Sequence, residues 1–242
     1  MVHVTVTDSR GRYIDDLGPA HFQVVEDGQP RQAVAFESLQ SGVSCALLLD
    51  TTASMHLALP ALKSAALQFI ADLRPVDSAA IYVGQRRRAE VMTAFAAGQT
   101  ALYDALARVS RDLSVRGGKK VIVLFSDGED NASTLASRRV MQRMRAVGIP
   151  VYTVAQGQAL QSQSLIKELA DLSTGTGGLA YAVAQGSEMS PVFERIAQDL
   201  AHGYLLAFTP EPSSRTGWRR IDVVVKSDRQ LKVRAREGYA ME

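Results

Sequence analysis

The sequence predicts an α/β fold: a doubly wound, mostly parallel sheet with one antiparallel edge strand, plus a small β-sandwich-like module built from both termini. Between residues 41 and 202, short apolar runs alternate with segments of helical periodicity, which is the order of a doubly wound sheet. Residues 1–40 and 203–242 show strand patterns alone. Chain termini often lie close together, so we expect the two end segments to pair.

The composition is that of a globular protein with a substantial core. The chain has 242 residues, of which 46% are hydrophobic and 21% charged. The net charge of +2 gives no indication of nucleic-acid binding. Cys45 is the only cysteine, which excludes an intramolecular disulfide. No apolar run reaches the roughly 18 residues that a transmembrane helix needs.

The first end segment, residues 1–40, predicts strands. The sequence HVTVTD alternates apolar and polar residues, and EDGQP separates two further apolar runs with an Asp-Gly turn typical of a hairpin. We expect this segment to form the N-terminal part of the β-sandwich-like module.

The central segment, residues 41–202, predicts the α/β domain. Its expected strands are VSCALLLD, SAAIYVG, RAEVMTAF, KKVIVLFSD, IPVYTVAQ and GLAYAV. The third follows the second through the short connection QRRR, so we expect that pair to be antiparallel. Helical spacing predicts helices after Pro60, after Thr100, over ASRRVMQRMRAVG, over SLIKELADLS and around Phe193. Gly148 is a candidate C-cap for the third helix.

The last segment, residues 203–242, completes the β-sandwich-like module. GYLLAFTP predicts one strand, and WRRIDVVVKSD and LKVRAREGYA predict a hairpin. Trp218 is expected to pack within this part of the protein.

Polar oxygen-bearing side chains follow two of the central strands. LLLDTTAS ends a strand at Asp50 and then presents Thr52 and Ser54, while VLFSD ends another strand at Asp127. Ligands of open α/β sheets bind at the carboxyl ends of strands. Thr100 stands at a loop-to-helix junction between them in sequence. Two carboxylates with hydroxyl groups suit magnesium. Considered without Thr100 and Asp127, however, Thr52 or Ser54 could equally be the N-cap of the following helix.

These motifs resemble the metal-ion-dependent adhesion site of von Willebrand factor A domains. The family pattern is Asp-x-Ser-x-Ser, a distant Thr and a distant Asp, and here it matches DTTAS, the threonine of GQT and the aspartate of SDG. The resemblance implies a Rossmann-like doubly wound fold with one antiparallel edge strand. It also implies a metal site for magnesium or manganese, formed by Asp50, Thr52, Ser54, Thr100 and Asp127. Thr52 replaces the commoner serine, and Ala53 stands where such proteins often have glycine.

The end segments resemble a bacterial subgroup, the von Willebrand factor A-related domains, in which β segments of this type frame the A domain. The resemblance implies cell adhesion or another protein–protein interaction, with a partner protein supplying an Asp or Glu carboxylate to the ion. It implies no nucleic-acid partner. Members are usually exported, so we expect a periplasmic, cell-surface or secreted protein whose signal is absent from this sequence; a cytoplasmic location is the alternative.

A non-enzymatic binding domain is therefore the leading interpretation, and two alternatives stay open. A haloacid dehalogenase-like, magnesium-dependent phosphotransferase would share the fold, the aspartate after LLL and the acidic SDGED stretch. Enzymes of that type resemble Asp-x-Asp-x-Thr at the first strand, whereas Thr52 takes the place of the second aspartate here. The other alternative is a scaffold domain whose metal site is not functional.

Several conspicuous residues have structural explanations. Cys45 lies in an apolar strand and is expected to be inert core. The arginines of ASRRVMQRMRAVG are expected to form the solvated face of that helix. TGTGG, at 174–178, precedes a strand and is expected to be a tight turn and not a phosphate loop. Asp104 is expected to fix a loop, and Asp130 to be solvated or to support the metal ligands.

Overall fold

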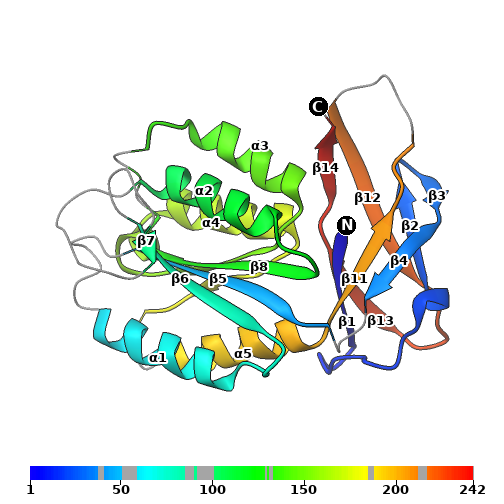
Figure 1. Cartoon of the computed structure of the whole chain (residues 1–242), viewed down its shortest axis with the longest axis horizontal. Helices are drawn as coiled ribbons and strands as arrows, with labels where there is room; N and C mark the ends of the chain where they lie inside the picture. The colour runs from blue at the N-terminus through cyan, green and yellow to red at the C-terminus, as the bar shows by residue number, and fades with distance from the viewer. Residues whose placement is uncertain are drawn as a thin grey trace.

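The computed structural model describes residues 1–37, 41–50, 59–84, 90–91, 101–128, 130, 133–184, 188–211 and 217–241. It consists of an α/β domain and a β module, which lie side by side (Figure 1). The predicted fold class is confirmed. The larger sheet is mostly parallel, and strands from the two ends of the chain combine in two further, antiparallel sheets.

The sheet of the α/β domain has six strands in the order β10-β9-β8-β5-β6-β7. Five of them are parallel, and β7 pairs with β6 in the antiparallel direction, as the short connection predicts. The chain continues from β5 to β6 on one side and crosses to β8 on the other, so the order reverses between β5 and β8. The strands are β5 (Val43–Asp50), β6 (Ser78–Gly84), β7 (Glu90–Val91), β8 (Lys119–Ser126), β9 (Val151–Ala155) and β10 (Ala180–Ala182).

Helices cover both faces of this sheet (Figure 1). One face packs against α2 (Leu102–Ser114), α3 (Ser137–Val147) and α4 (Gln163–Thr176), and the other against α1 (Leu59–Asp72) and α5 (Met189–Ala201). Short 3₁₀ helices lie at Pro19–His21 and Gly157–Gln161. The periodic apolar residues predicted for the second helix are all buried: Leu102, Ala105, Leu106, Val109 and Leu113. Gly148 caps α3 in the left-handed conformation, as predicted.

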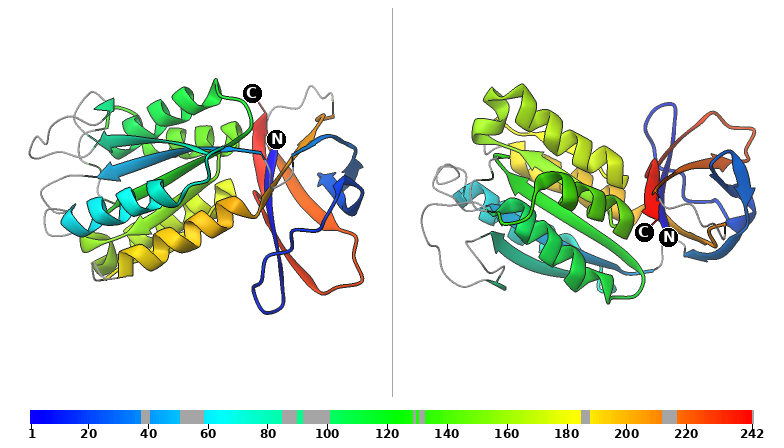
Figure 2. Two further views of the ribbon diagram at one scale, coloured as in Figure 1. Left: turned by 60° about the horizontal axis from the view of Figure 1, so that its bottom comes forward. Right: turned by 90° about the horizontal axis from the view of Figure 1, so that it is seen from above.

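The β module is a sandwich of two four-stranded sheets, ordered β13-β1-β11-β4 and β14-β12-β2-β3. Each sheet contains strands from both ends of the chain, and the two termini lie near each other (Figure 2). The strands from the first end are β1 (Val2–Asp8), β2 (Phe22–Glu26), β3 (Gln29–Arg31) and β4 (Ala33–Glu37). Those from the last end are β11 (Gly203–Phe208), β12 (Gly217–Val225), β13 (Leu231–Ala235) and β14 (Gly238–Met241).

A separate apolar core holds this sandwich together. Val2, Val4 and Val6 alternate along β1 and pack with Tyr204 and Leu206 of β11. The hydroxyl of buried Tyr204 donates a 2.6 Å hydrogen bond to the carbonyl of Ile14, so its polar end is satisfied. Since residues of both ends share this core, neither end can bury its apolar face alone.

The Asp-Gly turn forms the predicted hairpin between β2 and β3. Asp27 and Gly28 both have positive φ, 49° and 81°, as a type I′ turn requires. The chain then leaves this sheet, and β4 pairs with β11 in the other sheet. The residues after the turn therefore form two strands, β3 and β4, in different sheets, where the sequence predicted one apolar run.

The predicted pairing of WRRIDVVVKSD with LKVRAREGYA is confirmed only in part, because the end of the second segment, β14, pairs antiparallel with β12 but its beginning, β13, does not. β12 pairs with β14 and β2, whereas β13 pairs with β1 in the opposite sheet. The connection between β12 and β13 therefore crosses the sandwich, and Val233 of β13 faces the shared core. TGTGG was also placed inexactly: Thr174 to Thr176 complete α4, and Gly177 is its left-handed C-cap.

The two parts of the protein contact each other at the amino ends of the parallel strands. Asp199 of α5 accepts hydrogen bonds there from Tyr152 of β9 and Arg234 of β13. Arg234 also donates to the hydroxyl of Thr5, at 2.9 Å. An ion pair between buried Asp199 and partly buried Arg234 thus joins the α/β domain to the β module. No helix among the described residues is long and apolar enough to span a membrane.

Candidate metal centre

Two aspartates mark the carboxyl ends of the central strands. Asp50 is the last residue of β5, and Asp127 directly follows β8; both are buried. The strands pair in parallel with Leu49 beside Phe125, so Asp50 lies beside Ser126 and Asp127 is one residue further along. The structure thus brings the two predicted carboxylate residues to the point where the strand order reverses, the usual ligand position in such a sheet.

The hydroxyl of Ser126 connects the two strand ends. It donates a 2.9 Å hydrogen bond to Asp50 Oδ2 and accepts a 3.0 Å hydrogen bond from the backbone N–H of Gly128. Because Ser126 is fully buried, its side chain has little freedom to turn away. Ser126 therefore fixes one oxygen of Asp50 and leaves the other oxygen of that carboxylate outside this hydrogen bond.

The backbone beyond β8 turns sharply at Gly128. Its φ is +80°, and an added Cβ would approach Leu165 of α4 to 3.1 Å. Both the left-handed conformation and the contact with α4 favour glycine. An added Cβ on Gly157, after β9, would lie 3.6 Å from the Cβ of Asp127. Close packing on these sides holds the Ser-Asp-Gly segment in place.

The first turn of α2 is fixed by a neighbouring loop. Asp104 accepts hydrogen bonds from the backbone N–H groups of Thr134 and Leu135, both at 2.9 Å, and from the Thr134 hydroxyl at 3.0 Å. Burial opposes the charged carboxyl, but these hydrogen bonds outweigh it and lower the pKa of Asp104 below its ordinary value. Asp104 is thus a loop-fixing residue, as predicted.

Ser133 and Asp130 complete this attachment. The Ser133 hydroxyl accepts the backbone N–H groups of Tyr103 and Asp104, each at 3.1 Å, and so satisfies donors of the first turn of α2. Asp130 in turn accepts the backbone N–H of Ser133 at 3.0 Å. Asp130 therefore supports the loop beside the start of α2, while its expected role, solvated or supporting the metal ligands, stays a prediction.

The other three predicted ligands, Thr52, Ser54 and Thr100, lie outside the described residues. Within the described part of the chain, no group of three His, Cys, Asp or Glu side chains is arranged to hold a metal. The predicted site needs only two carboxylates, with hydroxyl oxygens for the rest. Buried carboxylates at adjacent strand ends are the hard oxygen ligands that magnesium takes, so the described residues fit such an ion.

Ser126 and Ser133 are functional candidates that the sequence interpretation did not single out. Ser126 could have been found from the strand register, since it is the residue that a parallel pairing of β5 and β8 places beside Asp50. Ser133 has no comparable signal, because its bonds to α2 span about thirty positions of sequence. Cys45 is buried, which raises the pKa of its thiol, and it belongs to the core as expected.

The rim, by which we mean the carboxyl ends of β5 and β8 with the start of α2, lies at the end of the domain away from the β module (Figure 1). The β module lies at the amino ends of the parallel strands, where Val4 and Thr5 of β1 come close to Val43 and Lys119. It leaves the rim uncovered, so a partner could approach the rim without displacing it.

The sequence from 85 to 195 matches the family model of the von Willebrand factor type A domain. This range includes Thr100 and Asp127 and begins after Asp50, Thr52 and Ser54. No curated protein matches the chain.

Solved structures share the fold over nearly the whole chain. The ArnB paralog VWA2 from Sulfolobus acidocaldarius is 14% identical, with a TM-score of 0.54, and the alignment covers 100% of this chain and 75% of that one. The von Willebrand factor type A protein from Catenulispora acidiphila is 13% identical, with a TM-score of 0.55, and the alignment covers 96% and 71% of the two chains. At these identities the likeness concerns the fold.

Proposed function

We propose that this chain, in which residues 85–195 match the von Willebrand factor type A domain, is a non-enzymatic protein-binding domain with a metal-dependent site at the rim. Domains of this family are in general protein-interaction domains. A magnesium-type ion would be held by Asp50, Thr52, Ser54, Thr100 and Asp127, and a partner protein would contribute an Asp or Glu carboxylate.

One observation carries the proposal: Asp50 and Asp127 are buried at the ends of neighbouring parallel strands, with Ser126 hydrogen-bonded to Asp50. Carboxylate oxygens are ligands that magnesium takes. Two aspartates at adjacent strand ends, at the position where α/β sheets bind ligands, therefore support a shared cation.

The charges of the ligand set give the site its preference for an anionic partner. Only the two aspartates carry negative charge, and Thr52, Ser54 and Thr100 are neutral. The ligand set therefore adds no negative charge beyond that needed to balance a divalent cation, and the ion would stay electrophilic. A bound ion would supply an electrophilic position for an anionic oxygen. The attraction would be stronger where surrounding loops exclude water, because the effective dielectric constant is lower there.

The chain's own residues would position this contact. Ser126 holds one Asp50 oxygen, and the Gly128 turn sets the direction in which Asp127 leaves β8. Ser133 and Asp104 anchor the first turn of α2, which Thr100 precedes in sequence. These supports involve buried or half-buried groups, so the rim is built on rigid elements.

A pull-down from lysate and secretome of the source organism, with magnesium and then with chelator, tests the proposed function. We expect a partner that is retained only with the ion, and that is released by Thr100→Ala and by one Asp→Ala or Glu→Ala change on its own surface. Affinity that stays within about twofold after all three changes would contradict the proposal. A phosphatase assay separates it from the phosphotransferase alternative, which predicts turnover that depends on Asp50.

A further inference from the structure

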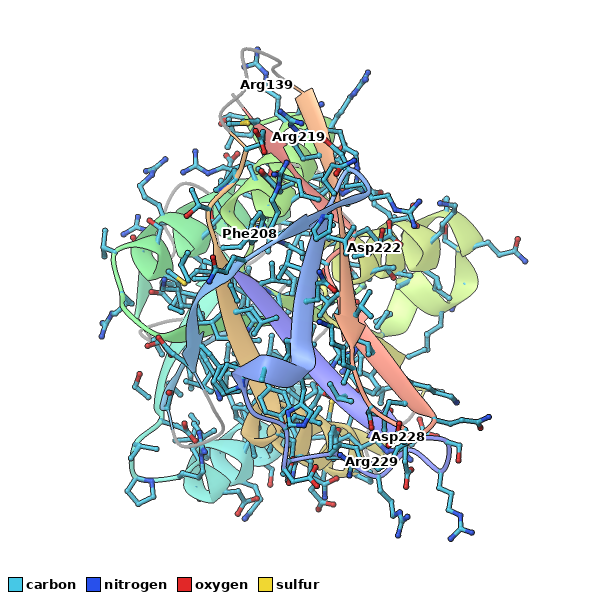
Figure 3. The ribbon with its side chains drawn as sticks, turned by 90° about the vertical axis from the view of Figure 1, so that its right-hand side faces the viewer. Arg139, Phe208, Arg219, Asp222, Asp228 and Arg229 are labelled. Atoms are coloured by element: carbon cyan, nitrogen blue, oxygen red, sulfur yellow. The ribbon has the colours of Figure 1, made fainter. Side chains whose placement is uncertain are left out.

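A hollow of about 680 Å³ lies where α3 meets the β module. We call it the junction groove. α3 and the residues leading into it line one side, and the paired ends of β12 and β14 line the other. The lining residues are Leu135, Arg139, Val140, Gln142, Arg143, Arg145, Ala146, Gly217, Trp218 and Ala240. The side-chain view places Arg139 at the same end of the protein as Arg219 of β12 (Figure 3).

Trp218 is the principal apolar surface of the groove. Its side chain is 48% exposed, although an indole of this size is usually largely covered. An added Cβ on Gly238 would lie 2.5 Å from the ring, so Gly238 lets the indole approach β14 closely. The Arg145 guanidinium lies 5.7 Å from the ring centre. The ring is therefore held in place while about half of its surface faces solvent.

The groove is positively charged. Among the described residues, its lining contains three arginines and no Asp or Glu. Arg139 and Arg143 are exposed, and neither forms an ion pair within the described part of the chain. Arg145 is half-buried against Gly175 of α4, and its Nε has no hydrogen-bond partner among the described residues. This face of α3 therefore carries cationic charge that the described side chains lining the groove do not balance.

We propose that the junction groove binds an acidic peptide segment of a partner protein, with an apolar side chain of that segment covering Trp218. Charge complementarity selects the occupant, because three arginines with no acid among the described lining residues attract carboxylates. A groove of this volume can enclose a short segment. Trp and Arg are also the residue types that contribute most strongly to binding in protein interfaces.

The overall charge favours a peptide over a nucleic acid. The net charge is +2 for the whole chain, whereas a nucleic-acid site is expected in a strongly basic domain. The groove shares no residue with the rim, so binding at the groove goes beyond the proposed function and needs no metal ion.

Trp218 provides a specific reporter, since it is the only tryptophan in the chain. The probe is a short peptide in which glutamates flank a central leucine, and its control carries glutamine in place of every glutamate. With chelator present, we expect the acidic probe to shift Trp218 emission to shorter wavelength and to protect it from acrylamide. The control probe should bind at least about tenfold more weakly. Added salt should weaken the binding of the acidic probe.

Charge reversal identifies the contact. Arg139→Glu and Arg143→Glu should each lower the affinity for the acidic probe about tenfold. Arg138→Glu is the matched control, because Arg138 is exposed on the same helix but does not line the groove; it should change affinity by less than about twofold. Circular dichroism of each variant checks that the fold is intact.

Several results would overturn the proposal. Equal affinity for the glutamate and glutamine probes would show that charge complementarity does not drive binding. No change in Trp218 emission with either probe would exclude binding at the groove. An RNA oligonucleotide that protects Trp218 when the peptide does not would assign the groove to nucleic acid. If Trp218 becomes protected from acrylamide as the protein concentration rises without any probe, and sedimentation shows dimers, the groove binds a second copy of the chain. Loss of binding at the rim would affect none of these readouts.

Discussion

Ser126 and Asp50 are joined by a buried 2.9 Å hydrogen bond between the ends of two parallel strands. The same hydroxyl accepts the N–H of Gly128 at 3.0 Å, so it connects the proposed ligand Asp50 with the turn that follows Asp127. Replacing a residue that orients a metal ligand typically costs about ten- to a hundredfold in metal affinity. The first prediction follows from this arrangement.

Ser126→Ala should weaken manganese binding by about ten- to a hundredfold, because Asp50 loses the group that orients it. It should also lower the free energy of unfolding by about 1 kcal/mol, since the Gly128 N–H loses a partner. Calorimetric titration and urea unfolding measure the two effects. Ser110→Ala is a matched control: Ser110 is equally buried, but its hydroxyl donates to the Ala107 carbonyl within α2. Unchanged manganese affinity in Ser126→Ala would contradict the positioning role.

The loop that fixes α2 gives a second prediction. Asp104→Asn keeps the size of the side chain but loses much of the acceptor strength for Thr134 and Leu135. We expect unfolding free energy to fall by about 1–2 kcal/mol and hydrogen exchange of the Thr134 and Leu135 amides to accelerate. Asp112→Asn, later in the same helix, keeps an acceptor for the Tyr82 hydroxyl and loses only a solvent-accessible 3.9 Å ion pair with Arg108, so it should change stability by less than about 0.5 kcal/mol. Unaltered exchange at both amides would show that Asp104 does not fix the loop.

The contact between the two parts of the protein gives a third prediction. Asp199→Asn removes a buried carboxylate and leaves the partly buried Arg234 guanidinium without its charged partner. Removing one partner of a buried ion pair typically costs about 3 kcal/mol or more, so the melting temperature should drop clearly in calorimetry. Asp171→Asn breaks only the exposed pair with Lys167 and should cost less than about 1 kcal/mol. Similar melting of the two variants would mean that the buried pair does not hold the two parts together.

Lys119 gives a prediction about pH. It is buried at the first position of β8, and its Nζ has no hydrogen-bond partner among the described residues. Burial, helped by Arg74, lowers its pKa from 10.5 to about 8. The unfolded chain therefore binds more protons than the folded protein between pH 8 and 10.5, and Lys119 makes stability rise with pH across that window. Below about pH 8, Lys119 is charged in the folded protein, and burying this ammonium lowers the free energy of unfolding.

Lys119→Met should accordingly stabilise the protein at pH 7, by an amount on the order of 1 kcal/mol, and the gain should shrink as the pH approaches 10. Urea unfolding at several pH values measures this. Lys120→Met, at the next strand position, serves as the control, because Lys120 is only half-buried. A destabilising effect of Lys119→Met at pH 7 would show that the ammonium has a favourable partner in the folded protein.

The α/β domain could be predicted well because its signals are local. The apolar run ending at Asp50 and the helical spacing of Leu102, Leu106 and Val109 each identify an element without knowledge of its neighbours. The antiparallel β7 follows in the same way from a connection too short for a crossover.

Strand pairing in the β module could not be predicted as well. β12 and β13 are separated by a short polar connection and look like a hairpin, yet β13 pairs with β1 more than two hundred positions away. The alternating pattern of Leu231 and Val233 shows that one face is buried, but it does not say against which sheet. The junction groove depends on the same long-range packing, since Trp218 and Arg145 are brought together only when β12 meets α3.

Manganese titration by calorimetry tests the central claim, metal binding at the rim, most directly. The wild-type protein should bind one equivalent of manganese, magnesium should compete for it, and calcium should bind less well because it prefers more ligands. The double variant Asp50→Ala, Asp127→Ala should lose this binding while its circular dichroism stays that of a folded protein. Equal manganese affinity in the wild type and the double variant would contradict the account.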